Sequence, residues 1–201
     1  MKKVALGTRL IAGFAVMGII MFLGGSAGFM GMTYLTKKTD NLSETRYPSM
    51  HYAELLLEYQ TSLRRLEAAL LVPETVADAG HREGIVHAMG ETWIHIENTF
   101  SSLEALPQHG EPETNLRNIA LAARILKAEQ ALFMKNAGEG KRPEALNQLS
   151  TSLSQSHETM ETLLQELSAT QREAIGQAGR DGAGWFGEIA LAVTFLGIFA
   201  A

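Results

Sequence analysis

The sequence of 201 residues contains no cysteine. This absence excludes a disulfide framework, a thiolate metal site, a covalently attached c-type haem and a cysteine nucleophile. A glycine-rich phosphate loop and the common nucleophile motifs are missing as well. The sequence therefore gives no reason to expect an enzyme or a bound cofactor.

Positive charge is also scarce, because 17 lysine and arginine residues stand against 22 aspartate and glutamate residues, a net charge of −5. The imbalance lies in residues 35–184, which hold 14 of the basic and 21 of the acidic residues. A nucleic-acid-binding protein normally has a clustered basic face, so we expect no nucleic-acid partner. Alanine, leucine, glutamate and glutamine dominate this stretch while valine and isoleucine are sparse, which predicts an all-α fold.

The first long apolar segment covers residues 10–34, which carry no charged side chain. About 20 apolar residues suffice to cross a bilayer, whereas the apolar part of a cleaved signal peptide has only about 7–15. We therefore predict a membrane helix at 10–34 that stays in the mature protein; a signal peptide that is removed is the alternative. Lys2, Lys3 and Arg9 indicate that residues 1–9 lie in the cytoplasm.

A second apolar segment, residues 185–201, begins with the aromatic pair Trp185 and Phe186. We expect it to be the truncated start of a second membrane helix, so that the protein passes the bacterial inner membrane twice; a weakly hydrophobic tail is the alternative. In the first apolar segment, small residues recur at helical spacing, which predicts a face for close contact with another membrane helix; the alternative is that glycine is simply common in membrane helices. This face consists of Gly24, Gly28 and Gly31.

Between the two apolar segments, apolar residues repeat at heptad spacing in four stretches, which predicts long helices packed at shallow angles. Short connections join the stretches, so neighbours are antiparallel, and we predict an up-down-up-down four-helix bundle over 35–184 that extends from two transmembrane helices. The four seams are Leu35, Leu42, Leu56, Leu63 and Leu70, beside Tyr52, Tyr59 and Leu66; Ile85, Met89, Trp93, Ile96, Phe100 and Leu103; Ile119, Leu126 and Phe133, beside Leu116 and Ala123; and Leu146, Leu153, Met160, Leu167 and Ala174, beside Leu149, Ser156 and Leu163.

Prolines mark the predicted helix ends. The pair Val72-Pro73 ends the first helix, because the residue before proline avoids helical angles, and Pro112 suits the first position of the third. The first and fourth helices are longer than the other two by about 15–20 Å and continue into the membrane segments. Pro48 lies where the bundle should begin, and a kink or break is expected there.

Basic and hydroxyl side chains form a candidate ligand site. Counting about 30 residues from each membrane segment brings Arg64 and Arg65 level with the hydroxyl-rich stretch 150–156, about 45 Å from the membrane. Guanidinium groups that face hydroxyl groups suit a small carboxylate or amino-acid ligand. We therefore predict a ligand site of Arg64, Arg65, Thr151, Ser152 and Ser154. The alternative is that the arginines pair with surface acids such as Glu58 or Glu67.

A stripe of Glu83, His87, Glu91 and His95 follows one face of the second predicted helix. Two histidines and a carboxylate are suitable ligands for zinc, so His87, Glu91 and His95 are candidate metal ligands. The stripe lies opposite the apolar seam, however, and its two histidines are about 12 Å apart along the helix. We therefore expect a solvated face without a metal ion.

The segments ALGTRLIAGFAVMGIIMFLGG and TDNLSETRYPSM, with an arginine pair late in the first helix, resemble the N-terminal part of bacterial methyl-accepting chemotaxis proteins. The most specific match consists of Gly7, Arg9, Leu10, Gly13 and Phe14. The resemblance covers essentially all of residues 1–201. It implies a periplasmic sensor domain that forms a parallel homodimer and binds a small molecule or a periplasmic binding protein. In a full-length receptor it also implies the chemotaxis kinase and its coupling protein as partners.

The resemblance bears on the site and on the output. In the family, amino-acid sensors use arginines late in the first helix and a hydroxyl on the fourth; Arg64 and Arg65 match the former, and residues 150–156 match the latter loosely. The same sensor occurs on histidine kinases and diguanylate cyclases, so the output class stays open. Residues 1–201 lack the HAMP linker, the adaptation helices and the kinase-contacting tip. The alternatives are a membrane-anchored structural or interaction bundle and a secreted helical protein.

Overall fold

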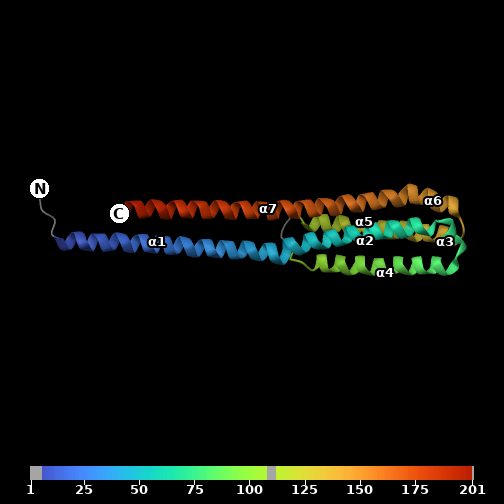
Figure 1. Ribbon diagram of the computed structural model, residues 1–201, viewed down its shortest axis with the longest axis horizontal. Helices are drawn as coiled ribbons and strands as arrows, with labels where there is room; N and C mark the ends of the chain where they lie inside the picture. Colours follow the sequence, from blue (N-terminus) through green and yellow to red (C-terminus); the bar gives the residue numbers. More distant parts are fainter. Residues whose placement is uncertain (1–5, 108–111, 201) are drawn as a thin grey trace. The chain divides into compact units, whose positions relative to one another are not determined.

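The computed structural model describes residues 6–107 and 112–200, and apart from short connections they are helical (Figure 1). The side chains of some helical residues lie outside the description, namely 6–13, 16, 19, 20, 23, 24, 27, 74, 76, 112, 113, 182, 183 and 185–200. The elements are α1 (Leu6–Asn41), the π-helical turn η1 (Leu42–Arg46), α2 (Tyr47–Leu70), α3 (Pro73–Ala77), α4 (Ala79–Glu104), α5 (Pro112–Gly138), α6 (Arg142–Ser150) and α7 (Ser152–Ala200).

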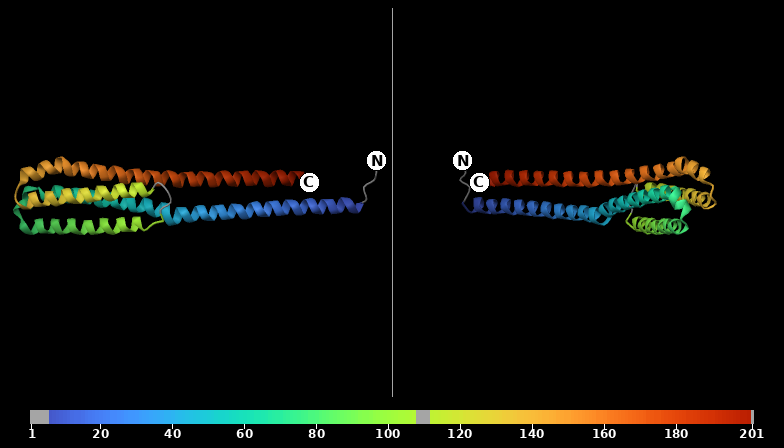
Figure 2. Two further views of the ribbon diagram at one scale, coloured as in Figure 1. Left: turned by 180° about the vertical axis from the view of Figure 1, so that it is seen from behind. Right: turned by 45° about the vertical axis from the view of Figure 1, so that its right-hand side comes forward.

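The chain divides into two compact units, one of residues 1–42 and 175–201 and one of residues 43–174. In the first unit, α1 and the C-terminal part of α7 lie side by side and run in opposite directions (Figures 1 and 2). Lys38 Nζ on α1 donates to Asp181 Oδ2 on α7 at 2.7 Å. This hydrogen bond raises the pKa of Lys38 above its ordinary value, so the lysine stays protonated and the ion pair joins the two helices.

Both predicted membrane segments are helical, since 10–34 lies inside α1 and 185–200 forms the end of α7. The side chains of 185–200 and of several residues in 10–34 lie outside the description. Within the described part of the chain, no helix has the combined length and apolar character that crossing a membrane requires.

The unit of residues 43–174 is a four-helix bundle, as predicted: α2, α4, α5 and the run formed by α6 with the first part of α7 lie side by side (Figure 2). All four contribute apolar side chains to one core. The most deeply buried large side chains, all below 2 % exposure, include Leu56, Leu63, Ile96, Leu103, Ile119, Leu126, Phe133, Leu153, Met160 and Leu164. The described residues contain no strand, which agrees with the expected all-α class.

The helix ends follow the local sequence. Around Pro48, where a kink or break is expected, the chain stays helical: it passes from α1 through the π-helical turn η1 into α2, and Pro48 occupies the first turn of α2. Asp78 caps α4, because its side chain accepts hydrogen bonds from the backbone amides of Gly80 and His81. Beyond α5, Gly140 has a φ of 73°, a conformation that glycine adopts without steric cost.

Three details differ from the expected pattern. Leu146, predicted in the seam of the fourth helix, is exposed. The fourth helix is not continuous, because Thr151, with φ −122° and ψ −97°, separates α6 from α7. In α2, the second row of the seam consists of Ala53, Gln60 and Glu67, all buried, whereas the predicted residues Tyr52, Tyr59 and Leu66 are half-buried. The core of the bundle therefore contains polar side chains at heptad positions.

Candidate ligand site

The predicted arginines face different surroundings. Arg64 on α2 is half-buried, and its Nη1 donates to Glu161 Oε2 on α7 at 3.1 Å. Its Nη2 is buried and has no hydrogen-bond partner among the described residues. Arg65, the next residue, is exposed. Arg64 therefore pairs with an acid across the interface between α2 and α7, which is the kind of partner that the alternative interpretation expected.

The predicted hydroxyl residues are divided between local and interhelical bonds. Thr151 is exposed, and its hydroxyl donates to the carbonyl of Asn147 at 2.6 Å. Ser154 Oγ donates to Glu158 Oε1 on the same helix at 3.4 Å. Ser152 Oγ, in contrast, donates to Glu129 Oε2 on α5 at 2.7 Å. In the described part of the chain, no hydrogen bond joins Arg64 or Arg65 to these hydroxyl groups, and the ligand role of the five residues stays a prediction.

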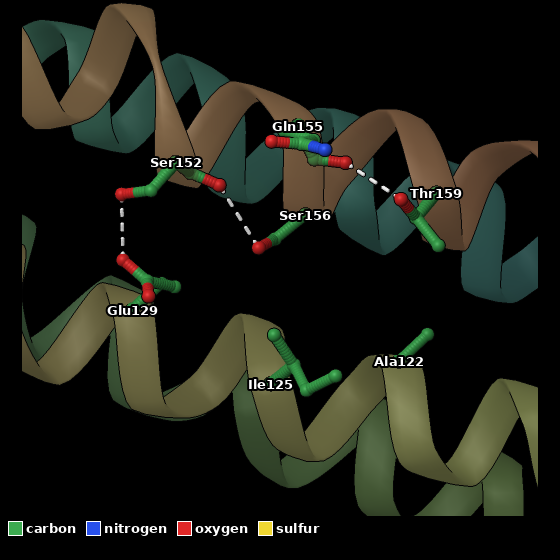
Figure 3. A pocket seen from close by; sticks show the side chains of 7 residues that line it. All are labelled: Ala122, Ile125, Glu129, Ser152, Gln155, Ser156 and Thr159. Carbon is green, nitrogen blue, oxygen red and sulfur yellow. Dashed lines mark hydrogen bonds between the residues drawn. The ribbon is translucent and has the colours of Figure 1, made fainter.

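A pocket of about 310 Å³ lies between α5 and the first turns of α7 (Figure 3). Its apolar wall consists of Ala122 and Ile125 on α5, and Ser152 is its one member from the predicted site. The remaining lining residues are polar: Glu129, Gln155, Ser156 and Thr159. The hydroxyl-rich stretch of the sequence thus does line a cavity, but the charged group beside it is a carboxylate.

Hydrogen bonds fix how the pocket's polar groups are presented. Ser156 Oγ donates to the carbonyl of Ser152 at 2.9 Å, and Thr159 Oγ1 donates to the carbonyl of Gln155 at 2.9 Å (Figure 3). Both hydroxyl hydrogens are therefore used within α7, and the oxygens keep free lone pairs. Glu129 Oε2 accepts from Ser152 and, at 3.2 Å, from Gln148 Nε2.

A chain of buried polar side chains crosses the core of the bundle. Trp93 Nε1 on α4 donates to Gln130 Oε1 on α5, and Gln130 Nε2 donates to Glu67 Oε1 on α2 at 2.9 Å. From the other side, His157 Nε2 on α7 lies 2.8 Å from Glu67 Oε2. Gln60 on α2 completes the chain, because its Nε2 donates to the carbonyl of His157 and lies 3.4 Å from His157 Nδ1. All four helices of the bundle contribute to this network.

The geometry assigns the hydrogen positions in the network. Gln60 Nε2 is a donor, so His157 Nδ1 is the acceptor of that pair and the ring proton lies on Nε2, where it points at Glu67. Both carboxylate oxygens of Glu67 then accept hydrogen bonds, as a buried carboxylate requires. Glu67 is 0 % exposed and the His157 side chain 1 % exposed.

Sequence reasoning missed this network, although one signal was present. Gln60 and Glu67 continue the heptad row of Ala53, and His157 falls between Leu153 and Met160 in the seam of the fourth helix. A polar residue at a seam position indicates a buried hydrogen bond. The partner of each polar side chain depends on how the helices are rotated, and the sequence alone does not provide that rotation.

The predicted metal stripe lies on the surface. His87 and Glu91, with side chains 77 % and 61 % exposed, form a contact of 3.5 Å between Nε2 and Oε1. The His95 ring stacks on Tyr59 of α2, with ring centroids 5.4 Å apart. Among the described residues, no group of three or more histidine, aspartate or glutamate side chains is close enough to hold a metal ion.

The predicted glycine face falls only partly within the description. The surroundings of Gly24 lie outside the described residues. Gly28 is exposed, and a Cβ atom added there would meet no atom within 4 Å, while Gly31 is buried. Contact of this face with another membrane helix stays a prediction.

Comparison with known protein families gives a match over most of the chain. Residues 3–182 match a family model that is described as a four helix bundle sensory module for signal transduction. The match agrees with the resemblance to the N-terminal sensory part of methyl-accepting chemotaxis proteins. A search of curated proteins finds no match.

Proposed function

The chain belongs to the family of four-helix-bundle sensory modules for signal transduction, and we propose that it is the sensory part of a transmembrane chemoreceptor. In this proposal, residues 10–34 and 185–201 lie in the bacterial inner membrane, and the bundle lies in the periplasm as part of a parallel homodimer. The bundle binds a small molecule. The last helix then moves, and a cytoplasmic output module, such as one that contacts the chemotaxis kinase and its coupling protein, reads the movement.

The continuity of α7 is the observation that carries the proposal. This helix runs from Ser152 to Ala200 without interruption, a length of 49 residues. Its first turns line the pocket, and its last turns coincide with the predicted second membrane segment. A ligand that favours one packing of the first turns therefore acts on the same helix that would cross the membrane, and such small helix shifts are a common signalling device.

The bonds between α2 and α7 support a bundle with discrete packings. His157 is bonded to Glu67 and Gln60, and Glu161 is bonded to Arg64. A movement of α7 along its axis breaks these bonds before it forms others, because hydrogen bonds weaken steeply with distance and angle. A ligand can then select between two arrangements instead of deforming the bundle gradually.

The absence of native cysteine makes cross-linking of introduced cysteines a direct test. Lys38→Cys with Asp181→Cys replaces the ion pair between α1 and α7, and we expect a disulfide to form in native membranes. We expect its rate of formation to change when a compound that binds the chain is added from a panel of amino acids, organic acids and amines. Lys38→Cys alone is the control for disulfides between copies. Binding of a compound without any change in this rate would contradict signalling through α7.

Membrane placement is tested with a membrane-impermeant maleimide on spheroplasts. The variant Thr61→Cys, at an exposed position of α2, should be labelled in intact spheroplasts. The variant Lys3→Cys should be labelled only after lysis. Labelling of residue 61 only after lysis would overturn the periplasmic placement of the bundle.

A further inference from the structure

We propose that the pocket between α5 and α7 is a binding site for a small ligand with an ammonium group on a short hydrocarbon chain, with Glu129 as the residue that binds the ammonium group. The biological role of this site rests on the proposed sensory function. Ligand binding does not, because it is measured on the isolated chain. It also differs from the carboxylate ligand that the arginines of α2 suggested.

Charge is the first reason. Glu129 is half-buried in the wall of the pocket, and its Oε2 accepts from Ser152 at 2.7 Å and from Gln148 at 3.2 Å. No lysine, arginine or histidine pairs with this carboxylate in the described part of the chain, and no hydrogen bond there reaches its Oε1. A partly desolvated carboxylate without a counter-ion attracts a cation, and a charge-assisted hydrogen bond is stronger than a neutral one.

The direction of the hydrogen bonds is the second reason. The hydroxyl hydrogens of Ser156 and Thr159 are donated to carbonyl groups of α7, and that of Ser152 is donated to Glu129. Each hydroxyl oxygen therefore meets the pocket as an acceptor. Among the polar lining residues, Gln155 alone has an N–H donor in its side chain. An ammonium group has three donors and no acceptor, so it complements this lining, whereas a carboxylate does not.

Size and apolar lining define the rest of the ligand. The volume of about 310 Å³ is at the lower end of the roughly 300–1,000 Å³ that is typical of small-molecule sites. Ala122 and Ile125 on α5 point toward α7 and offer an apolar surface to a short alkyl chain (Figure 3). A divalent metal ion fits less well, because calcium requires about 6–8 oxygen ligands and usually several carboxylates, while Glu129 is the single acid in the lining.

Titration calorimetry on the full chain in non-ionic detergent tests the proposal with three probes of similar size: n-butylamine, butyrate and 1-butanol. We expect n-butylamine to bind at one site per chain, at least tenfold more tightly than the other two. Glu129→Gln keeps the shape and removes the charge, and it should weaken n-butylamine binding by about tenfold or more. Glu129→Lys places a tethered ammonium group in the pocket and should abolish binding. Glu166→Gln, at an exposed position of α7, is the matched control and should bind like the unmodified chain.

Several results would overturn the site: equal n-butylamine affinity in the unmodified chain and Glu129→Gln, stronger binding of butyrate, or binding of calcium chloride alone. Circular dichroism at 222 nm checks that each variant remains helical. The two proposals fail separately. Amine binding without an effect on cross-linking between residues 38 and 181 supports the site and contradicts the sensory function. A cross-linking response to an acidic ligand, without amine binding, supports the sensory function and contradicts the site.

Discussion

Replacing Glu67 by leucine removes the central acceptor of the buried network, and we expect a large loss of stability. In the native bundle, Glu67 accepts from Gln130 Nε2 at 2.9 Å and from His157 Nε2 at 2.8 Å. The substitution leaves both donors buried without a partner. Each orphaned donor costs about 1–3 kcal/mol, so the sum is about 2–6 kcal/mol. We therefore expect a loss of about 2–6 kcal/mol in the free energy of unfolding.

A near-isosteric substitution separates the hydrogen bonds from packing. In Glu67→Gln, the amide oxygen still accepts one bond, but the amide nitrogen places a second donor beside either Gln130 Nε2 or His157 Nε2. One donor is then unpaired, so we expect a loss of about 1–3 kcal/mol. In a double-mutant cycle of Glu67→Leu with His157→Leu, the double variant contains no imidazole whose buried N–H donor lacks a partner. We expect the loss of unfolding free energy in the double variant to be smaller than the sum of the two single losses by about 1–3 kcal/mol.

Urea unfolding of the chain in detergent provides the measurement, with circular dichroism at 222 nm and tryptophan fluorescence as probes. The chain has two tryptophans, Trp93 and Trp185, so Trp185→Phe in every variant leaves fluorescence from the network alone. A loss below about 1 kcal/mol for Glu67→Leu, or a double-mutant cycle without coupling, would refute the assigned network. Equal losses for leucine and glutamine would instead show that the shape of the side chain and the one acceptor kept by glutamine do not matter, and that the loss comes from removing the charged carboxylate.

Three further predictions concern separate parts of the chain. Asp78→Ala removes the cap of α4 and should lower the free energy of unfolding by about 1 kcal/mol, measured by the same urea titration, with the exposed Glu104→Ala as control. The hydrogen bond and ion pair of Glu139 with Lys141 lower the pKa of the glutamate, so its NMR titration midpoint should lie below 4.5. The stabilising contribution of this ion pair should be present above the ordinary glutamate pKa and should disappear as the pH falls through the lowered pKa. Lys141→Ala should return the titration midpoint of Glu139 to its ordinary value. Gly28→Cys should form disulfides between copies in membranes faster than Phe29→Cys, because only the former lies on the predicted glycine face; equal rates would exclude that face.

Much of the bundle followed from apolar periodicity. Leu56, Leu63 and Leu70 lie in the core as the heptad spacing predicted, and η1 ends at Arg46, two positions before Pro48. These features depend on local rules, namely the side-chain period of a helix and the missing amide hydrogen of proline. They need no knowledge of the neighbouring helices.

The buried polar residues of the core could not be predicted from apolar periodicity, because burial of a polar residue depends on its hydrogen-bond partners. Tyr59 looks like a better core residue than Gln60, yet Tyr59 is half-buried and stacks on His95, while Gln60 is 2 % exposed. The hydroxyl-rich stretch was recognised as a candidate ligand wall, but its charged neighbour is Glu129 instead of Arg64. Helix rotation decides which neighbour a side chain meets, and rotation is a property of the packed bundle.

The network and the pocket lie on neighbouring faces of the same turns of α7. Ser156 lines the pocket, and the next residue, His157, is bonded to Glu67 in the core. Each dispersion contact between apolar side chains is weak and non-directional, so no single apolar contact is decisive when a helix slides by a small distance. A buried hydrogen bond between an imidazole and a carboxylate resists such a slide, because its energy depends on distance and angle and its loss leaves two polar groups without a partner or solvent. A ligand that moves Ser156 therefore also displaces His157, whose hydrogen bond to Glu67 is either formed or broken. That difference gives a bundle of apolar helices the discrete states that a sensory module needs.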